Sequence, residues 1–294
     1  MNFKYQVKLL FFLIITGLFS CTKSQIKKDD STGTSNLKES TILNISYGKH
    51  TQQTYDIYLP AHRDSNTAAI LLLHGGAWKA GDKADVNNYV TLIKNTWKNV
   101  AIANMNYRLA SNANNIHHNE IMDDIKLVVS HLVNNKNNYN VSTKLGIMGT
   151  SAGGHLAMIY AYKYNYQNNI KCIGNIFGPS NLNDWSWYNS YNLWLGGKVG
   201  DFITEYVGQS WDTTVYKSVS PIWNISSQSQ PTIIFHGNLD PIVPLYQSQH
   251  LSDKLNKSGV TRQYNEYVAF HGFDENQNID VVNKLVAFFK TYLK

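Results

Sequence analysis

Continuous apolar runs alternate with segments of helical periodicity along most of the chain. Five runs have the length and composition of strands covered on both faces, AAILLLHGG, VAIANMNY, KLGIMG, IKCIGNIFG and PTIIFHG. Helical spacing appears over about residues 119–135, 152–166 and 246–257, and again from Val281 to Phe289. TYDIYLP alternates apolar and polar residues and predicts an earlier, half-buried antiparallel strand, and RQYNEYV predicts a late strand. This order predicts an α/β fold with a mostly parallel central sheet and helices on both faces.

Residues 180–223 interrupt this alternation, because they carry many tryptophans and tyrosines with little periodicity. An insertion at the carboxyl ends of sheet strands lies over the ligand crevice of such folds. We therefore expect Trp185 and Trp187 to line a substrate pocket, where they would stack on a sugar or an aromatic acyl group. The alternative is that these aromatic side chains only seal the insertion onto the domain.

The first forty residues are expected to lie outside the fold. Residues 1–20 combine Lys4 and Lys8 with the apolar run LLFFLIITGLF, as a signal peptide does. LFSC at 18–21 resembles the lipobox of bacterial lipoproteins, so Cys21 is the predicted lipid attachment site and residues 21–40 a flexible tether. A plain secretory signal is the alternative. Either predicts export, and the first predicts a membrane-anchored protein in the periplasm or on the cell surface. The catalytic domain is then residues 41–294, and its oligomeric state stays open.

Composition narrows the classes of partner. Net charge is +6, but the lysines and arginines form no dense basic stripe, so we expect no nucleic-acid partner. His117 and His118 are adjacent, yet no Asp, Glu or Cys set with ligand spacing accompanies them, and we expect no metal site.

The pattern Gly149-Thr150-Ser151-Ala152-Gly153 marks a candidate nucleophile. Alone it is weak, because a glycine-containing chain of this length matches G-x-S-x-G by chance about once in ten cases. Its context is more specific: a buried strand precedes Ser151 and an apolar helix follows it, as in a nucleophile elbow. The amide of Ala152 would stand at the helix N-terminus, where negative charge is favoured.

A serine hydroxyl needs a base, and the base needs an acid. His155 is nearest in sequence but falls inside the following helix. His271, in AFHGF, lies in a loop after the last strand, where the order Ser…acid…His places the base. Asp240, in HGNLDPIVP, follows a buried strand and is preferred on position over Asp274.

The loop HGGAW, from His74 to Trp78, follows another buried strand and offers backbone donors for an oxyanion. We assign the N–H groups of Gly76 and Ala77 to this hole, together with that of Ala152. Trp78 either walls the substrate pocket or packs beneath the insertion.

HGGAWKAGDK, NYRL, GTSAGGHLA, FGPSNL, HGNLDPIVP and FHGF stand in the order seen in α/β-hydrolase esterases. The chain most resembles the HGGxW branch, which holds bacterial feruloyl and acetylxylan esterases, related carboxylesterases and kynurenine formamidase-like enzymes. The resemblance covers about residues 41–294. It implies the α/β-hydrolase fold, acyl transfer to water without a cofactor, and a triad of Ser151, Asp240 and His271. One departure is ASNANNIHHNEIMDD after NYRL, where the family often has a proline-rich segment.

These features predict a serine carboxylic-ester hydrolase that acts through an acyl-enzyme. The expected substrates are short acyl esters or carbohydrate-linked esters, such as acetyl and feruloyl esters. An amidase, peptidase or formamidase of the same fold is one alternative, because a triad does not choose its leaving group. A non-catalytic surface lipoprotein that binds carbohydrate is another.

Overall fold

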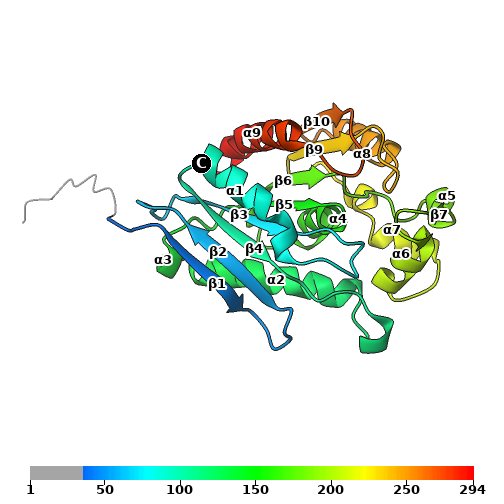
Figure 1. Cartoon of the computed structure of the whole chain (residues 1–294), viewed down its shortest axis with the longest axis horizontal. Helices are drawn as coiled ribbons and strands as arrows, with labels where there is room; N and C mark the ends of the chain where they lie inside the picture. The colour runs from blue at the N-terminus through cyan, green and yellow to red at the C-terminus, as the bar shows by residue number, and fades with distance from the viewer. Residues whose placement is uncertain (1–35) are drawn as a thin grey trace, which may run out of the picture. The chain divides into compact units, whose positions relative to one another are not determined.

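A central eight-stranded sheet organises residues 36–294, the part of the chain that the computed structural model describes (Figure 1). In sheet order its strands are β1 (Ser40–Ser46), β2 (Thr54–Leu59), β4 (Val100–Met105), β3 (Ala68–Leu73), β5 (Leu145–Thr150), β6 (Ile170–Ile176), β9 (Thr232–Gly237) and β10 (Arg262–Tyr267). The strands from β4 to β10 pair in parallel, whereas β1 and β2 are antiparallel. A separate two-stranded sheet joins β7 (Tyr191–Asn192) to β8 (Gly197–Lys198).

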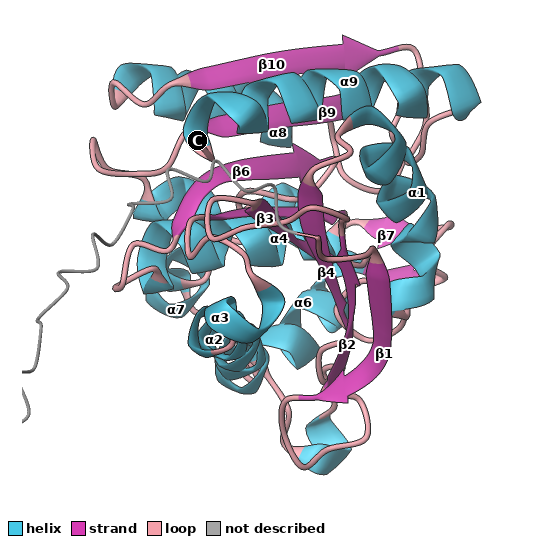
Figure 2. Cartoon of the chain, turned by 90° about the vertical axis from the view of Figure 1, so that its left-hand side faces the viewer, coloured by secondary structure: helices cyan, strands magenta, loops and turns pink. Residues whose placement is uncertain are grey.

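Helices cover both faces of the central sheet (Figure 2). The helices are α1 (Asn87–Thr96), α2 (His118–Asn134), α3 (Lys136–Tyr139), α4 (Ala152–Ile159), α5 (Trp185–Tyr188), α6 (Val199–Val207), α7 (Thr213–Ser218), α8 (Tyr246–Lys257) and α9 (Glu275–Tyr292). A π-helical turn at Tyr160–Tyr164 continues α4. Apolar residues of α1 and α9 pack in one cluster with the sheet, and those of α2, α4 and α8 pack in the other. The predicted fold class is confirmed.

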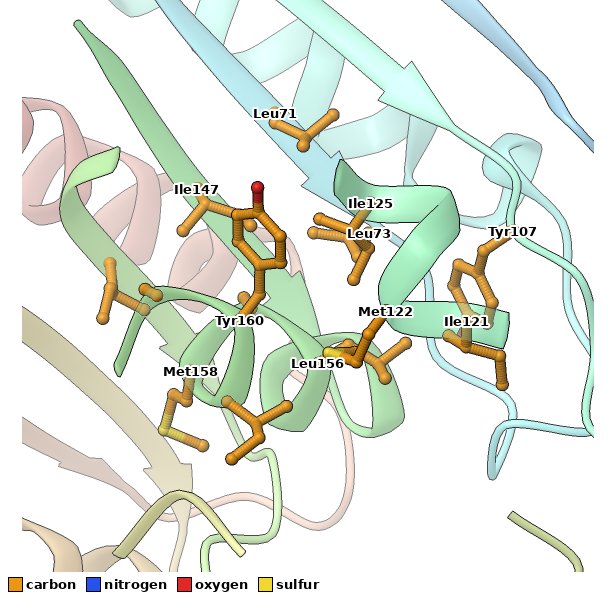
Figure 3. Packing of buried hydrophobic residues seen from close by; sticks show 14 of the residues in the cluster. Leu71, Leu73, Tyr107, Ile121, Met122, Ile125, Ile147, Leu156, Met158 and Tyr160 are labelled. Atoms are coloured by element: carbon orange, nitrogen blue, oxygen red, sulfur yellow. The ribbon is translucent and has the colours of Figure 1, made fainter. Parts of the chain in front are cut away.

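The two clusters explain why the central parallel strands are apolar at most positions. Successive strand residues point to opposite faces, so Ile70 and Leu72 enter the α1–α9 cluster while Leu71 and Leu73 enter the other. Figure 3 shows Leu71 and Leu73 near side chains of α2 and α4, including Ile125. Both faces of β3 are therefore shielded from solvent, and neither could carry a polar side chain without a hydrogen-bonding partner.

Several elements differ from the sequence predictions, and strand β1 and the short helices of the insertion are among those that were not predicted. Helix α1 was not predicted, although Tyr89, Val90 and Ile93 form its buried side. Strand β2 is more buried than expected, because Asp56 is only 8% exposed and pairs with Lys83 Nζ at 2.9 Å. The ion pair lets a carboxylate occupy a position that the alternating pattern assigned to solvent.

The predicted signal peptide and Cys21 lie outside the described residues. Within residues 36–294, none of the helices combines the length and the apolar character needed to cross a membrane. Leu37 and Lys38, which the sequence placed in the tether, already contact the domain. Their carbonyl oxygens accept hydrogen bonds from the His62 amide at 2.8 Å and from Arg63 Nη1 at 2.7 Å.

Candidate active site

Ser151 occupies the sharp turn between β5 and α4. Its backbone has φ 52° and ψ −120°, a conformation that costs a non-glycine residue on the order of 1–3 kcal/mol. The turn is tight: a Cβ on Gly149 would lie 2.3 Å from the carbonyl carbon of Gly153. A Cβ on Gly153 would lie 2.3 Å from the Leu73 carbonyl oxygen. Glycine is therefore required on both sides of the serine, and the predicted strand–turn–helix is present.

His271 and Asp240 reach Ser151 from two loops at the same edge of the sheet. Asp240 follows β9 and His271 follows β10. His271 Nε2 is 2.8 Å from Ser151 Oγ, and His271 Nδ1 is 2.6 Å from Asp240 Oδ2. An ionised carboxylate can only accept, so Nδ1–H donates to Asp240 and Nε2 accepts from the serine hydroxyl. The structure thus brings the three predicted residues into one hydrogen-bonded chain.

The carboxylate of Asp240 is buried and fully engaged. Its Oδ1 accepts from the amides of Ile242 at 2.8 Å and Val243 at 3.0 Å, while Oδ2 lies 3.2 Å from His236 Nε2. Burial by itself would raise the pKa of Asp240. Hydrogen bonds from His236, His271 and the backbone outweigh burial and hold that pKa well below its ordinary value. Asp240 is therefore an anion at neutral pH, as a group that orients an imidazole must be.

His236 is a contact of the site that the sequence interpretation did not identify. It is the next-to-last residue of β9, its side chain is buried, and it stands four residues before Asp240. Its Nε2 also lies 2.9 Å from the Val243 carbonyl oxygen, and its Nδ1 lies 2.6 Å from Ser248 Oγ. Because both neighbours of Nε2 are acceptors, Nε2 carries the proton and Nδ1 accepts from the serine hydroxyl.

The loop after β3 runs beside Ser151. A Cβ on Gly75 would lie 3.2 Å from the Ser151 Cβ. The next three residues, Gly76, Ala77 and Trp78, have φ values of 110°, 49° and 63°. Among the hydrogen bonds found within residues 36–294, none uses the N–H of Gly76, Ala77 or Ala152 as donor. These three predicted donors are thus available to a ligand.

Trp78 anchors this left-handed loop in the protein. Its ring stacks on Tyr206 of α6 at 4.7 Å and meets the edge of His155 at 5.3 Å. Its Nε1–H donates to His155 Nδ1 at 3.3 Å, and His155 Nε2–H donates to the Val219 carbonyl oxygen at 2.9 Å. Burial lowers the pKa of His155 to about 3. His155 is therefore a neutral residue whose two ring nitrogens are already engaged. This agrees with the sequence analysis, which preferred His271 over His155 as the base.

A cavity of about 470 Å³ opens directly over Ser151, and we call it the inner cavity. Its floor is formed by the loop from Gly75 to Trp78, with Ser151 and His271. Its roof comes from the insertion, whose lining residues are almost all apolar: Trp187, Trp194, Leu195, Val199, Phe202 and Ile203. The expected placement of the aromatic insertion over the site is thus observed.

The structure divides the three tryptophans that the sequence assigned to the pocket. Trp78 and Trp187 line the inner cavity, and the Trp187 Nε1–H also donates to the Ile242 carbonyl oxygen at 3.1 Å. Trp185 does not line it, so that prediction was wrong. Trp185 is 57% exposed, and its ring packs against that of Trp211 at 4.9 Å, within the insertion itself. Trp194 takes a place in the wall that no sequence pattern distinguished from that of Trp185.

The adjacent histidines near α2 are held by protein groups. His117 Nδ1 bonds to the Glu205 carbonyl oxygen at 2.8 Å, and His118 lies between the hydroxyls of Tyr206 and Tyr164. In the part of the chain that the structure describes, no group of three His, Cys, Asp or Glu side chains is placed to hold a metal ion.

Comparisons with known proteins agree on the fold. A curated relative, Esterase LipC of Mycobacterium tuberculosis, is 23% identical over 247 residues, which cover 78% of this chain but 59% of the relative. Among solved structures, a truncated carbohydrate esterase from gut microbiota superposes with a TM-score of 0.71 at 20% identity, over 86% of this chain and 97% of that one. An inhibited esterase B from Lactobacillus rhamnosis gives a TM-score of 0.70 at 18% identity, over 86% and 87% of the two chains. These superpositions establish the α/β-hydrolase fold.

Residues 55–255 match the model of the BD-FAE family. The match spans most of the chain, from β2 into α8, and includes the loop from Gly75 to Trp78, the turn at Ser151, the insertion and Asp240. The chain therefore belongs to the BD-FAE family of α/β-hydrolases.

Proposed function

We propose that this protein is a serine esterase, a carboxylic-ester hydrolase with Ser151 as nucleophile, His271 as general base and acid, and Asp240 as the orienting acid. The observation that carries the proposal is the hydrogen-bonded chain of these residues beside three unused amide donors. The names of the relatives support it, since they include Esterase LipC, esterase B and a carbohydrate esterase.

In the first half of the reaction, Ser151 Oγ attacks the ester carbonyl carbon while its proton passes to His271 Nε2. The carbonyl oxygen becomes an oxyanion, and the N–H groups of Gly76, Ala77 and Ala152 donate to it; such a donor contributes about 2.7–4 kcal/mol. The tetrahedral intermediate then expels the alcohol oxygen, which takes the proton from His271. An alcohol leaves and an ester of Ser151 remains.

Water completes the cycle. It attacks the acyl-Ser151 carbonyl as His271 Nε2 takes one of its protons, and the same amides hold the second oxyanion. Collapse of this intermediate breaks the bond to Ser151 Oγ, which recovers the proton from His271, and the carboxylic acid leaves. The Asp240 anion stabilises the imidazolium in both halves.

The volume and apolar lining of the inner cavity favour esters with apolar acyl groups, including the carbohydrate-linked feruloyl type. Its volume of about 470 Å³ exceeds what an acetyl group fills, and its insertion side offers Trp187, Phe202 and Ile203 rather than polar groups. Each buried methylene contributes about 0.8 kcal/mol, or roughly a fourfold gain in kcat/KM. Among p-nitrophenyl esters, rates should therefore rise from acetate to butyrate and hexanoate. A comparison with acetylated xylan and methyl ferulate tests the carbohydrate-linked class.

A fluorophosphonate probe tests the nucleophile. The wild-type protein should be labelled and inactivated, whereas Ser151→Ala should be neither labelled nor active. An unlabelled wild type would favour the non-catalytic alternative, and a labelled Ser151→Ala would assign the nucleophile elsewhere. Parallel assays with matched p-nitrophenyl esters and p-nitroanilides separate an esterase from an amidase or peptidase, and N-formylkynurenine tests the formamidase alternative.

We also propose that the chain is exported and anchored through a lipid on Cys21, on the basis of the LFSC motif alone. Metabolic labelling with an alkyne fatty acid should tag the wild-type protein and not Cys21→Ala. An untagged wild type found free in the periplasm or medium would favour the plain secretory signal.

A further inference from the structure

A second cavity of about 400 Å³ adjoins the inner one, and we call it the outer cleft. Trp194, Ile242 and His271 line both cavities. Ser151 and the loop of amide donors line the inner cavity only. The two cavities therefore meet at these three side chains, one of which is the proposed general base.

Trp194 forms the wall between the two cavities, and its backbone is held by the side chain of Asn192. It lies in the turn between β7 and β8, where Asn192 Oδ1 accepts from its amide at 2.9 Å and from that of Leu195 at 3.1 Å. The Asn192 Nδ2 donates to the Pro241 carbonyl oxygen at 2.7 Å. This last bond ties the turn to the residue next to Asp240, so the wall keeps its place beside the reacting groups.

We propose that the outer cleft binds the alcohol part of the ester, an inference that rests on the proposed esterase activity. The leaving oxygen must receive its proton from His271 Nε2, so the alcohol part projects from the His271 side of the tetrahedral carbon. The cavity on that side, sharing His271 but none of the amide donors, is the outer cleft. The acyl part then occupies the inner cavity under the insertion.

The lining of the outer cleft indicates the class of alcohol. Trp194, Val268 and Phe270 are 70%, 75% and 60% exposed, an unusual concentration of large apolar side chains on an open surface. The charged residue of the cleft, Asp274, already caps helix α9 by accepting from the Gln277 amide at 2.8 Å. Large apolar side chains on these walls favour an alcohol that carries a ring with an apolar face, over a methyl or ethyl alcohol.

Two isomeric esters test the assignment, because benzyl acetate carries its ring on the alcohol and methyl phenylacetate carries it on the acyl group. In Phe270→Ala, which removes a ring from the outer cleft only, kcat/KM for benzyl acetate should fall about tenfold. The value for methyl phenylacetate should stay within about twofold. In Trp194→Ala, kcat/KM should likewise fall by a larger factor for benzyl acetate than for methyl phenylacetate. Trp185→Ala is the matched control, since Trp185 is an exposed tryptophan of the same insertion that lines neither cavity, and it should change neither value.

The outcomes separate this inference from the function on which it rests. A larger loss on methyl phenylacetate would place the acyl group in the outer cleft and overturn the assignment. Equal losses on both isomers in Phe270→Ala and Trp194→Ala, or no loss in either variant, would also overturn it. If the wild type hydrolyses neither isomer and resists the fluorophosphonate, the proposed esterase function itself fails.

Discussion

The carboxyl edge of the sheet and the insertion at residues 180–223 meet at one cavity but are built differently. At the sheet edge, backbone geometry sets the position of each group, through the turn at Ser151 and the left-handed loop ending at Trp78. In the insertion, the short helices α5 and α7 are held by contacts among aromatic side chains, and the turn between β7 and β8 is held by hydrogen bonds of the Asn192 side chain. The difference suggests that the edge fixes the chemistry and tolerates little change, whereas the insertion sets the shape of the substrate and tolerates more.

The largest expected effect is a steric one at the sheet edge. In Gly153→Ala, the new Cβ would meet the carbonyl oxygens of Leu73 and His74 at 2.3 and 2.4 Å, and backbone atoms cannot move aside cheaply. We expect a loss of about 3 kcal/mol or more in the free energy of unfolding, and loss of activity. Gly196→Ala in the insertion is the matched control, because its Cβ would meet nothing within 4 Å. It should cost about 1 kcal/mol, through its φ of 70°. Similar losses in urea unfolding of the two variants would break the comparison.

The two regions are joined by buried histidines, and this gives a pH dependence. Burial lowers the pKa values of His155 and His118 to about 3. Below about pH 6.5 the unfolded chain binds protons that the folded chain does not. The free energy of unfolding should therefore have its full value above that pH. It should decrease toward pH 3 by up to ~1.4 kcal/mol per pH unit for each histidine. Urea titrations at pH 7, 6 and 5 measure the slope, and His155→Phe and His118→Phe should each make it shallower. An unchanged slope in both variants would contradict this account.

A smaller effect is expected from the second histidine on the triad acid. His236→Phe removes the N–H that lies 3.2 Å from Asp240 Oδ2 while keeping a ring in place. The Asp240 anion then loses one of the donors that stabilise it. We therefore expect kcat to fall about tenfold with little change in KM. Asp240 should also hold the proton shared with His271 more tightly, which moves the acid limb of the kcat/KM profile to higher pH. Ser248→Ala, which acts one bond further away, should show the same changes more weakly. A uniform loss of activity with no movement of the limb would indicate a structural role only.

The smallest effect separates two tryptophans of the insertion. Trp187→Phe removes the hydrogen bond to the Ile242 carbonyl oxygen from a side chain that is 6% exposed, and should cost about 1 kcal/mol of stability. Trp185→Phe changes a residue that is 57% exposed and should stay within about 0.5 kcal/mol of the wild type. Thermal unfolding of the two variants gives the comparison, and equal losses would mean that Trp185 supports the insertion as strongly as Trp187 does.

The sheet and the triad could be predicted because their signals are local. A strand buried on both faces is apolar at nearly every position, so β3 and β5 are visible as runs. A nucleophile turn needs small residues at fixed offsets, which Gly149 and Gly153 supply around Ser151. Asp240 and His271 follow strands at the carboxyl edge, where parallel strands bring their loops together. Helix α1 was missed although its buried side is periodic, because its ten residues are largely polar.

The sequence alone therefore determined the α/β class, the predicted triad Ser151, Asp240 and His271, and the loop of amide donors, because each depends on a local pattern at the end of a strand. Only the tertiary structure decided which aromatic residues face the substrate. Trp185 and Trp194 stand nine positions apart in the same aperiodic insertion, yet one packs against another tryptophan of the insertion and the other lines two cavities. The contact between His236 and Asp240 was likewise decided only by the tertiary structure. These placements depend on where the insertion and the acid loop pack against the sheet, and contacts between segments distant in sequence leave no periodic pattern to detect.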